Sequence, residues 1–397
     1  MAGLAPVFDN VRAFKQALRV ATFDTREEYL KIIKFGTIKE TKPYPESPTT
    51  AVIIFAQHFG LVETKHYCAY CGAEFDMKTK KGGDREIRWS WRGPRYGWGC
   101  SECDDSEVSM VKGTILEKVK TSSWIDFFDV LVMWLQGETP LTMKREVRKP
   151  NCVVDPWVKI VQKAAIDWIN SNMTLPGFHE SYKKAMLKKK ENPDKKGAFI
   201  VQADEAYLNK GKLSKLAPGV RPKKNKVWLW GLVVQGHPEQ FFFRLLEFPE
   251  DAYDGRPRGK KEMILNFDTV GLRKGMTVVS DSWRATIAAL KHIKQREGWT
   301  NRTLPTELVV HSKGQVKNRR GYNTNAIENR WSVLKRWIKK TKGGKLPPSS
   351  NRRLWNNVVT EFQYRKVASK NYSTDGGHTF TVATKTFFKH ITEVYSS

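Results

Sequence analysis

The stretch AFIVQADEAYL, residues 198–208, predicts a buried β-strand that carries a carboxylate near its end. Its apolar residues run almost without a break to Ala203, and Asp204 follows. Two further apolar runs, at 226–236 and 240–248, predict two more strands that are joined by hairpins. These three strands begin an α/β region.

Strands and helices alternate in the chain that follows. We predict helices at 259–272 and 284–293, and strands at 276–283 and 306–312. Three consecutive strands followed by such an alternation predict a mixed sheet flanked by helices. The chain therefore contains an α/β domain with helical cover.

The last helix of this region, NTNAIENRWSVLKRWIKK at residues 323–340, has two different faces. The apolar face repeats at helical spacing and consists of Ile327, Trp331, Leu334 and Ile338. The neighbouring polar face consists of Asn325, Glu328, Ser332, Lys335 and Lys339. We expect the apolar face to pack on the sheet and the polar face to meet an anion or a metal ion.

Carboxylates follow two of the predicted strands, at Asp204 and Asp281. A carboxylate beside a buried apolar strand is unfavourable unless it is paired or bound to a metal, although a single Asp there is more often a turn or cap residue. Together with Glu328, the two aspartates supply three carboxylates that can converge at one edge of the sheet. Two Mg²⁺ or Mn²⁺ ions, about 3.5–4 Å apart, need such ligands to hold the attacking and leaving oxygens of a phosphodiester.

Four cysteines form two Cys-x-x-Cys pairs, Cys68 with Cys71 and Cys100 with Cys103. Each pair places two thiolates on one side of a tight turn, so the two pairs predict a tetrahedral cage for one structural Zn²⁺. The segment between the pairs is longer than usual, and its basic stretch at 78–85 predicts a hairpin tip. A redox role is the alternative for a single pair, and two pairs in one small module argue against it.

The composition favours a polyanionic partner. The 397 residues include 69 Lys and Arg but only 41 Asp and Glu, which gives a formal net charge of +28. Nucleic acid is the first candidate for this partner. A basic ribosomal or chromatin-type protein would show the same charge balance. The 14 Trp and 20 Phe exclude a disordered basic tail. No secretory signal or membrane span is expected.

Changes in composition divide the chain into six predicted parts: an N-terminal helical region (1–60), a zinc ribbon (61–112), a helical region of helix-turn-helix type (113–182), a basic linker (183–196), an α/β domain (197–370) and a C-terminal tail (371–397). In the region 113–182 we expect three short helices, the last with Asp155 as N-cap and Pro156 at the first helical position. A helical spacer without a DNA contact is the alternative for this region.

The order of the motifs resembles the Merlin-type DDE transposases and their bacterial relatives of the ISXO-like type. The resemblance rests on both Cys-x-x-Cys pairs, GTILEKVKTSSWIDFF (113–128), VQADEAYLNKG (201–211), VVSDSW (278–283), VVHS (309–312), NTNAIENRWSVLKR (323–336) and EFQYRK (361–366). It covers roughly residues 60–370. It implies that a zinc ribbon is joined to an RNase H-like DDE catalytic domain, at 197–370, which cuts and pastes DNA with divalent metal.

The resemblance also implies roles for individual residues. Asp204 and Asp281 match the first two catalytic acids, and Glu328 matches the third. Lys335 falls where the family places a basic residue that contacts DNA phosphate, and His311 matches a histidine near the site.

One departure from the family pattern affects the third acid. The family has His-Thr-Asn before the Ile-Glu pair, whereas this chain has Asn323 in the position of the histidine. Some bacterial relatives use an Asn as the third residue, so Asn325 competes with Glu328. We favour Glu328, because an anionic oxygen neutralises Mg²⁺ better than an amide does. The segment between Asp281 and Glu328 is also longer than the family pattern.

The expected function is that of a DNA transposase, which binds the terminal inverted repeats of its element and catalyses two-metal-ion cleavage and strand transfer. The alternatives are a domesticated, non-catalytic zinc-ribbon DNA-binding protein and a nuclease of the same fold. Cutting both ends in one complex implies a homodimer or higher oligomer on double-stranded DNA, in the nucleus of a eukaryotic host or in the cytoplasm or nucleoid of a bacterium. The predicted DNA contacts are Arg88, Arg92, Arg95, Lys335, Arg336 and Lys339, and the Trp residues among the first three equally suit packing of the ribbon.

Overall fold

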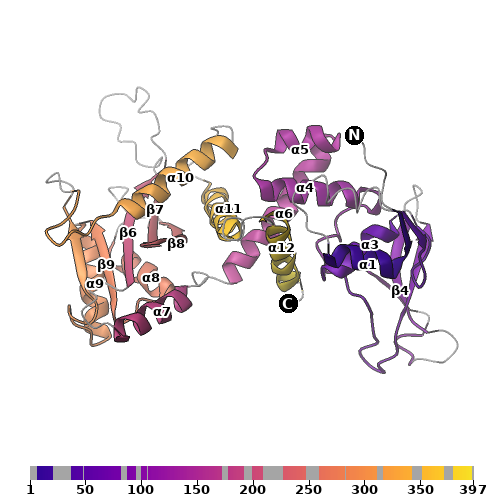
Figure 1. The fold of residues 1–397 in the computed structure, drawn as a ribbon, viewed down its shortest axis with the longest axis horizontal. Coiled ribbons are helices and arrows are strands. Elements are labelled where there is room, and N and C mark those ends of the chain that lie inside the picture. Colours follow the sequence, from indigo (N-terminus) through magenta and orange to yellow (C-terminus); the bar gives the residue numbers. More distant parts are fainter. Residues whose placement is uncertain are drawn as a thin grey trace. The chain divides into compact units, whose positions relative to one another are not determined.

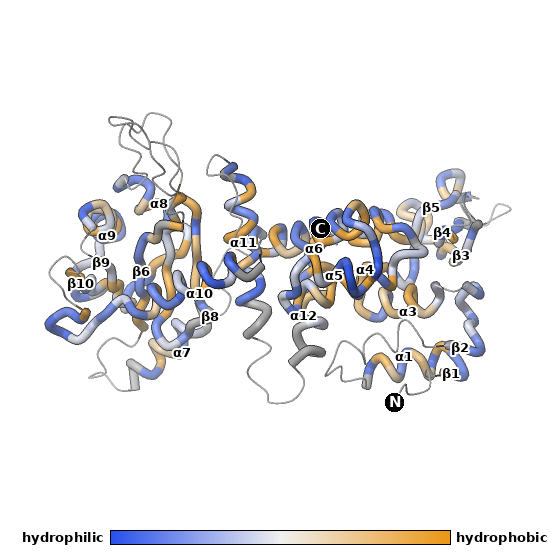
Figure 2. Tube along the Cα trace, turned by 90° about the horizontal axis from the view of Figure 1, so that it is seen from above, coloured by the Kyte–Doolittle hydropathy of each residue, from blue (hydrophilic) through white to orange (hydrophobic). Residues whose placement is uncertain are grey.

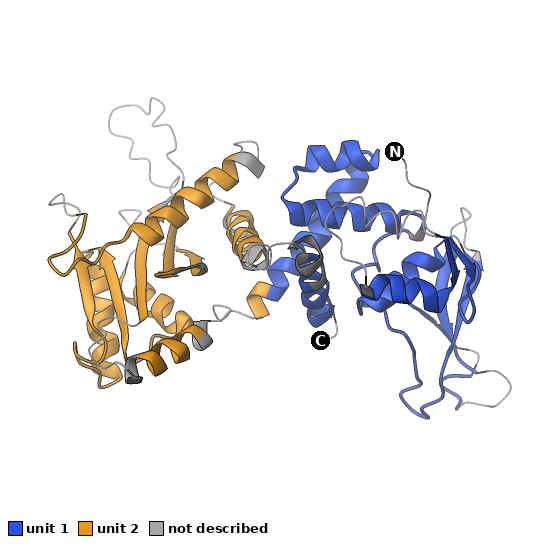
Figure 3. Cartoon of the chain, viewed as in Figure 1, with its two compact units in different colours: residues 1–168, 368–397 blue, residues 169–367 orange. Residues whose placement is uncertain are grey.

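The chain divides into two compact units in the computed structural model (Figure 3). One unit comprises residues 1–168 and 368–397, and the other comprises residues 169–367. The structure describes residues 7–20, 37–47, 49–81, 87–94, 100–104, 106–171, 178–191, 199–208, 227–246, 259–281, 283–310, 316–341, 351–370 and 379–395.

The second unit is built on a five-stranded mixed sheet in the order β10-β9-β6-β7-β8 (Figure 1). Its strands are β6 (Phe199–Tyr207), β7 (Trp228–Val234), β8 (His237–Leu245), β9 (Met276–Asp281) and β10 (Thr306–Val309). The pairs β6–β7 and β7–β8 are antiparallel, and β6–β9 and β9–β10 are parallel. The three predicted hairpin strands and the mixed sheet are thereby confirmed.

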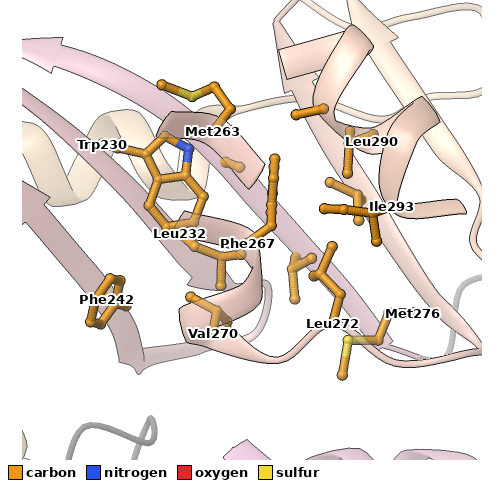
Figure 4. Close-up of a cluster of buried hydrophobic side chains, with 14 of the residues drawn as sticks. Trp230, Leu232, Phe242, Met263, Phe267, Val270, Leu272, Met276, Leu290 and Ile293 are labelled. Atoms are coloured by element: carbon orange, nitrogen blue, oxygen red, sulfur yellow. The ribbon is translucent and has the colours of Figure 1, made fainter. Parts of the chain in front are cut away.

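Helices cover both faces of this sheet. They are α7 (Phe178–Glu191), α8 (Lys260–Val270), α9 (Arg284–Arg296), α10 (Asn325–Thr341) and α11 (Arg352–Lys370). On one face, Trp230, Leu232, Phe267 and Leu290 belong to a core cluster with α8 and α9 (Figure 4). On the other face, residues of β7 and β8 pack against α10 and α11. Successive side chains of a strand alternate between the faces, which explains how β7 serves both cores.

Helix α10 lies on the sheet as its apolar stripe predicts. Ile327, Trp331, Leu334 and Ile338 are all buried, at 5% exposure or less. A buried side chain of the sheet caps the helix, because the Gln202 Oε1 accepts the backbone N–H groups of Ala326 and Ile327 at 2.9 and 3.2 Å. This contact satisfies two N–H groups that a helix N-terminus leaves without a partner.

The first unit contains a small antiparallel sheet with the order β3-β4-β5. Its strands are β3 (Asp76–Lys81), β4 (Ile87–Arg92) and β5 (Glu107–Ser109), and β3 and β4 pair as the predicted hairpin. The helices are α1 (Val11–Val20), α3 (Thr50–His58), the 3₁₀ turn η2 (Thr121–Ser123), α4 (Trp124–Gln136), α5 (Pro140–Val147), α6 (Asn151–Ser171) and α12 (Thr379–Tyr395). Hydrophilic and hydrophobic residues alternate along α1, as expected of a helix with one buried face (Figure 2). Helices α3 and α4 are instead buried over consecutive residues, at 52–57 and 127–134.

The structure corrects two predictions near the ends of the chain. The region 1–60 is not all helical, because β1 (Val7–Asn10) and β2 (Thr37–Glu40) pair in parallel. A predicted helix near residues 25–35 lies outside the described residues. The region 371–397 is not a polar tail throughout, because the helix that residues 384–394 suggest is present within α12 and buries Phe387, Phe388 and Ile391.

Two further corrections concern helices. The region 183–196 is not a linker throughout, because α7 continues to Glu191. Its lysines suggest a solvated segment, but Tyr182 and Met186 pack against the core of the second unit. Helix α6 begins at Asn151, so Pro156 lies inside it rather than at its first position. Asp155 is accordingly no N-cap; its carboxylate pairs with the Lys144 Nζ at 2.9 Å.

Helices α4, α5 and α6 follow one another with short connections, as predicted for 113–182. Thr139 caps α5, and Arg148 adopts a left-handed conformation between α5 and α6. Whether these helices enter a DNA groove stays a prediction. Among the described helices, none is long and apolar enough to cross a membrane.

We expect Gln202→Met to loosen α10 from the sheet. The substitution keeps the length of the side chain but removes the acceptor of two buried N–H groups, so the free energy of unfolding should fall by about 1–3 kcal/mol. Thermal unfolding measures this loss. The control is Gln235→Met, which alters only the exposed acceptor of the Gln202 amide and should change the stability by less than about 0.5 kcal/mol. Equal effects of the two substitutions would contradict the capping role.

Candidate metal sites

Two carboxylates lie where the parallel strands β6 and β9 separate. The two strands pair from Phe199 to Ala203 and from Met276 to Ser280. The next residue of each strand is Asp204 or Asp281, so both aspartates stand at the carboxyl end of the parallel pair. Ligands of open α/β sheets bind at this end of the strands. The structure thus brings together the two aspartates that the sequence singled out, and their catalytic role stays a prediction.

Glu205 joins the two aspartates. One carboxylate oxygen each from Asp204, Glu205 and Asp281 lies within 4.8 Å of the others. The Thr286 hydroxyl of α9 donates to the Glu205 Oε1 at 3.2 Å. Sequence reasoning missed Glu205, since adjacent residues of a strand point to opposite faces. Because β6 no longer pairs with β9 beyond Ala203, the longer side chain of Glu205 can bring its carboxylate to the two aspartates.

Burial and like charges raise the pKa of Asp204 to about 6. Burial is the largest cause, and the charge of Asp281 acts in the same direction, as does that of Glu328 to a smaller extent. Hydrogen bonds from the Glu205 backbone N–H and the Trp331 indole oppose the rise in pKa. Carboxylate oxygens are the ligands that Mg²⁺ and Mn²⁺ prefer, and a divalent ion relieves the repulsion among them. The donor set therefore fits one or two such ions.

Glu328 lies near this cluster but outside the three carboxylates that meet within 4.8 Å. Its side chain is exposed in the first turn of α10, and its Oε1 accepts the Thr324 hydroxyl at 2.8 Å. Asn325 is also exposed, and its backbone N–H donates to the Asn323 Oδ1 at 3.1 Å. Both candidates for the third ligand therefore stand at the N-terminus of α10, and the choice between them stays a prediction.

The predicted DNA contacts on α10 are all solvent-exposed. Lys335, Arg336 and Lys339 face water on the helix that carries Glu328. Their exposure leaves them available to phosphate oxygens. His311, which the family pattern places near the site, lies outside the described residues.

Four of the five cysteines of the first unit form one cluster, and Cys152 is not part of it. The Sγ atoms of Cys68 and Cys100 are 3.6 Å apart, as are those of Cys71 and Cys103. Tight turns hold each pair, with the Gly72 N–H donating to the Cys68 carbonyl and the Cys103 N–H to the Cys100 carbonyl. One Sγ of each cysteine lies within 4.8 Å of the others. Four thiolates at this spacing fit one tetrahedral Zn²⁺ and leave no open position for catalysis.

The protein environment already favours one of these thiolates. Backbone N–H groups of Ala73 and Cys100 donate to Cys71 and lower the pKa of its thiol to about 6. Burial instead raises the pKa of the Cys103 thiol to about 12. Zinc binds thiolates, so its binding must release the proton that burial retains on Cys103.

Two tryptophans of the region 61–112, Trp89 and Trp91, pack rather than face solvent. Trp89 and Trp91 are each 3% exposed, and the Trp89 Nε1 donates to the Thr49 Oγ1 at 2.8 Å. This burial supports packing as the role of these two residues, and Trp98 lies outside the described residues. On the same strand, Arg88 is exposed and Arg92 is half-buried. Arg95 lies outside the described residues.

Comparison with known proteins assigns neither a family nor a function. No protein-family description and no curated protein matches the chain. Among solved structures, the Mos1 strand transfer complex is 13% identical over 69% of this chain and 91% of that chain, with a TM-score of 0.20. A pre-cleavage Mos1 transpososome is 12% identical over 92% of this chain and 98% of that chain, also with a TM-score of 0.20. Superposition this poor does not establish a shared fold.

Removal of zinc should unfold the ribbon. We expect one Zn²⁺ per chain by elemental analysis of the purified protein, and its loss in Cys71→Ser together with increased proteolysis of the region 61–112. Cys152→Ser is the matched control, because Cys152 is exposed on α6 and distant in sequence from both pairs. A ribbon that stays protease-resistant without zinc would contradict this prediction.

Asp204→Asn should stabilise the metal-free protein at neutral pH. The pKa of Asp204 is about 6 in the folded chain and about 3.9 in an unfolded one, so ionisation opposes folding. This penalty is absent below about pH 4, grows between pH 4 and 6, and is complete above pH 6. The variant should therefore exceed the wild type by about 1–3 kcal/mol at pH 7.5 in thermal unfolding.

At pH 4 the two proteins should unfold at the same temperature, because Asp204 is then protonated in the native chain. An advantage of the variant that is equal at pH 4 and pH 7.5 would show that packing, and not charge, causes the difference.

Proposed function

We propose that this protein is a DNA transposase of the Merlin type, which cleaves and joins DNA with two divalent metal ions. The observation that carries the proposal is the meeting of Asp204 and Asp281 at the ends of two parallel strands. Local propensity gives no reason to place two carboxylates there, and burial with like-charge repulsion makes the arrangement unfavourable without a cation.

The arrangement of strands supports an RNase H-like catalytic domain. Three antiparallel strands, β6 to β8, are followed by two parallel strands, β9 and β10, which extend the sheet from the other edge of β6. The first acid lies on the first strand and the second acid on the fourth, as the motif order of the family implies. The third acid would come from α10, or from Glu205 on β6 itself.

Asp204, Asp281 and a third carboxylate would hold the ions. When bound, the metal supplies an activated oxygen nucleophile and stabilises the departing oxygen of the phosphodiester. For this, Asp204 must give up the proton that its raised pKa retains near pH 6. The exposed Lys335 and Arg336 of α10 would orient the DNA by contacting its phosphates.

The rest of the chain would recognise DNA ends. The zinc ribbon presents the exposed Arg88, and α4 to α6 follow as a compact helical segment. A net charge of +28 suits a long double-stranded DNA partner, and binding should weaken steeply with salt. Action on two transposon ends in one complex implies a homodimer or higher oligomer, in the nucleus if the host is eukaryotic.

The test is a cleavage assay on the DNA that flanks the gene, with Mg²⁺ or Mn²⁺. We expect metal-dependent cuts at defined positions. Asp281→Ala should lower the cleavage rate by at least about 100-fold, because the metal contributes several kcal/mol to the barrier, while binding to the DNA ends is retained.

Three further variants identify the third ligand. Glu205→Gln, Glu328→Gln and Asn325→Ala each remove one candidate, and the true ligand should show a loss comparable to that of Asp281→Ala. End binding without cuts in the wild type would favour a domesticated DNA-binding protein. Hydrolysis without strand transfer would favour a nuclease.

A further inference from the structure

Trp331 connects the core of the second unit with the candidate catalytic site. Its side chain is 5% exposed, and its Nε1 donates to the Asp204 Oδ2 at 3.2 Å. Its ring stacks on Phe243, with centroids 4.2 Å apart and planes inclined by 22°. An indole has one donor and no acceptor, so the ring orientation alone decides which oxygen receives its N–H.

Gly231 makes room for this ring. It lies directly opposite Asp204 in the antiparallel pair of β6 and β7, so that a side chain at 231 would point to the same face as Asp204. A Cβ at 231 would lie 2.5 Å from the Trp331 Cη2 and 2.7 Å from the Phe243 Cδ1. The indole therefore reaches Asp204 across a position that has no side chain.

The helix that carries Trp331 is itself fixed. Gln202, two residues before Asp204, caps α10, and Ile327 and Leu334 bury the turns on either side of the indole. Packing alone would be satisfied by any large apolar ring at 331. It does not account for an N–H directed at a carboxylate.

We propose that Trp331 is a positioning residue for the proposed metal site, which holds the Asp204 carboxylate through its indole N–H. The inference rests on the proposed function. Trp331 engages one oxygen of Asp204, fixes the rotation of the carboxylate, and leaves the remaining acceptor positions for metal. Partners of metal-ligating groups fix their orientation in this way, and their removal typically weakens metal affinity about 10- to 100-fold.

The test is Trp331→Phe in the full-length protein, which keeps an aromatic ring in the core and removes the N–H. Mn²⁺ binding is measured without DNA, from the electron paramagnetic resonance signal of the free ion. We expect Mn²⁺ affinity about 10-fold lower than in the wild type. Gly231→Ala should weaken Mn²⁺ binding in the same direction, because it displaces the ring.

The matched control is Trp355→Phe. Trp355 is fully buried in the same core cluster, so the substitution causes a similar loss of packing while the hydrogen bond from Trp331 to Asp204 is kept. Its Mn²⁺ affinity should equal that of the wild type. An equal loss of affinity in Trp331→Phe and Trp355→Phe would overturn the inference, because core packing would then explain both.

A second measurement needs no metal. The indole N–H resonance of Trp331, assigned by its absence from Trp331→Phe, should shift in Asp204→Asn, because a charged acceptor is replaced by a neutral one. An unshifted resonance would overturn the inference.

The outcomes separate this inference from the proposed function. If the wild type binds Mn²⁺ equally well with and without Asp204 and Asp281, the proposed function fails and the inference falls with it. If binding requires both aspartates but Trp331→Phe binds Mn²⁺ as the wild type does, the inference alone is overturned.

Discussion

In the second unit, the parallel pairing of β6 with β9 holds Asp204 and Asp281 close together and partly out of water. Their carboxylate oxygens lie within 4.8 Å of each other, and like charges at such a distance repel each other by a few kcal/mol in a protein environment. The parallel pairing of β6 with β9 imposes this proximity, because the pairing ends one residue before each aspartate. The apolar cores on both sides of the sheet supply the stability that keeps the carboxylates in place. Such strain is typical of functional sites, and a bound cation relieves it.

The two faces of the sheet contribute differently to the site. Asp204 shares a face with Gly231 and α10, whereas Glu205 points to the face of α9 and is bound by Thr286. Beyond Ala203, β6 no longer pairs with β9. Side chains from both faces of β6 can therefore reach the end of the parallel pair, where the carboxylates meet. The site is therefore built from two cores at once. Each core contributes a hydrogen bond to the carboxylates, from Trp331 to Asp204 and from Thr286 to Glu205.

Strong local patterns made most of this architecture predictable. The apolar runs of β6 to β9, the apolar stripe of α10 and the spacing of the four cysteines each identify an element without reference to the rest of the chain. What the sequence did not reveal depends on contacts between distant residues. The approach of Glu205 to Asp204 depends on where β9 leaves β6, and the cap of α10 by Gln202 links residues more than 120 positions apart. The many lysines of residues 183–191 predict a solvated linker, whereas the structure forms α7 there, because Tyr182 and Met186 pack against the core.

In the proposed metal site, the choice of third ligand would depend on what each candidate gives up on binding metal. Glu205 already lies within the cluster, but Thr286 holds one of its oxygens. Glu328 is held by the hydroxyl of Thr324 in an exposed first turn, and breaking one such hydrogen bond costs about 1 kcal/mol. A carboxylate that binds Mg²⁺ would regain more than that. Asn325 gives up least, but its neutral amide leaves the repulsion between Asp204 and Asp281 less compensated. The balance of charge therefore favours a glutamate over Asn325. Glu205 and Glu328 each accept a hydroxyl that metal binding would displace, so the choice between them stays a prediction.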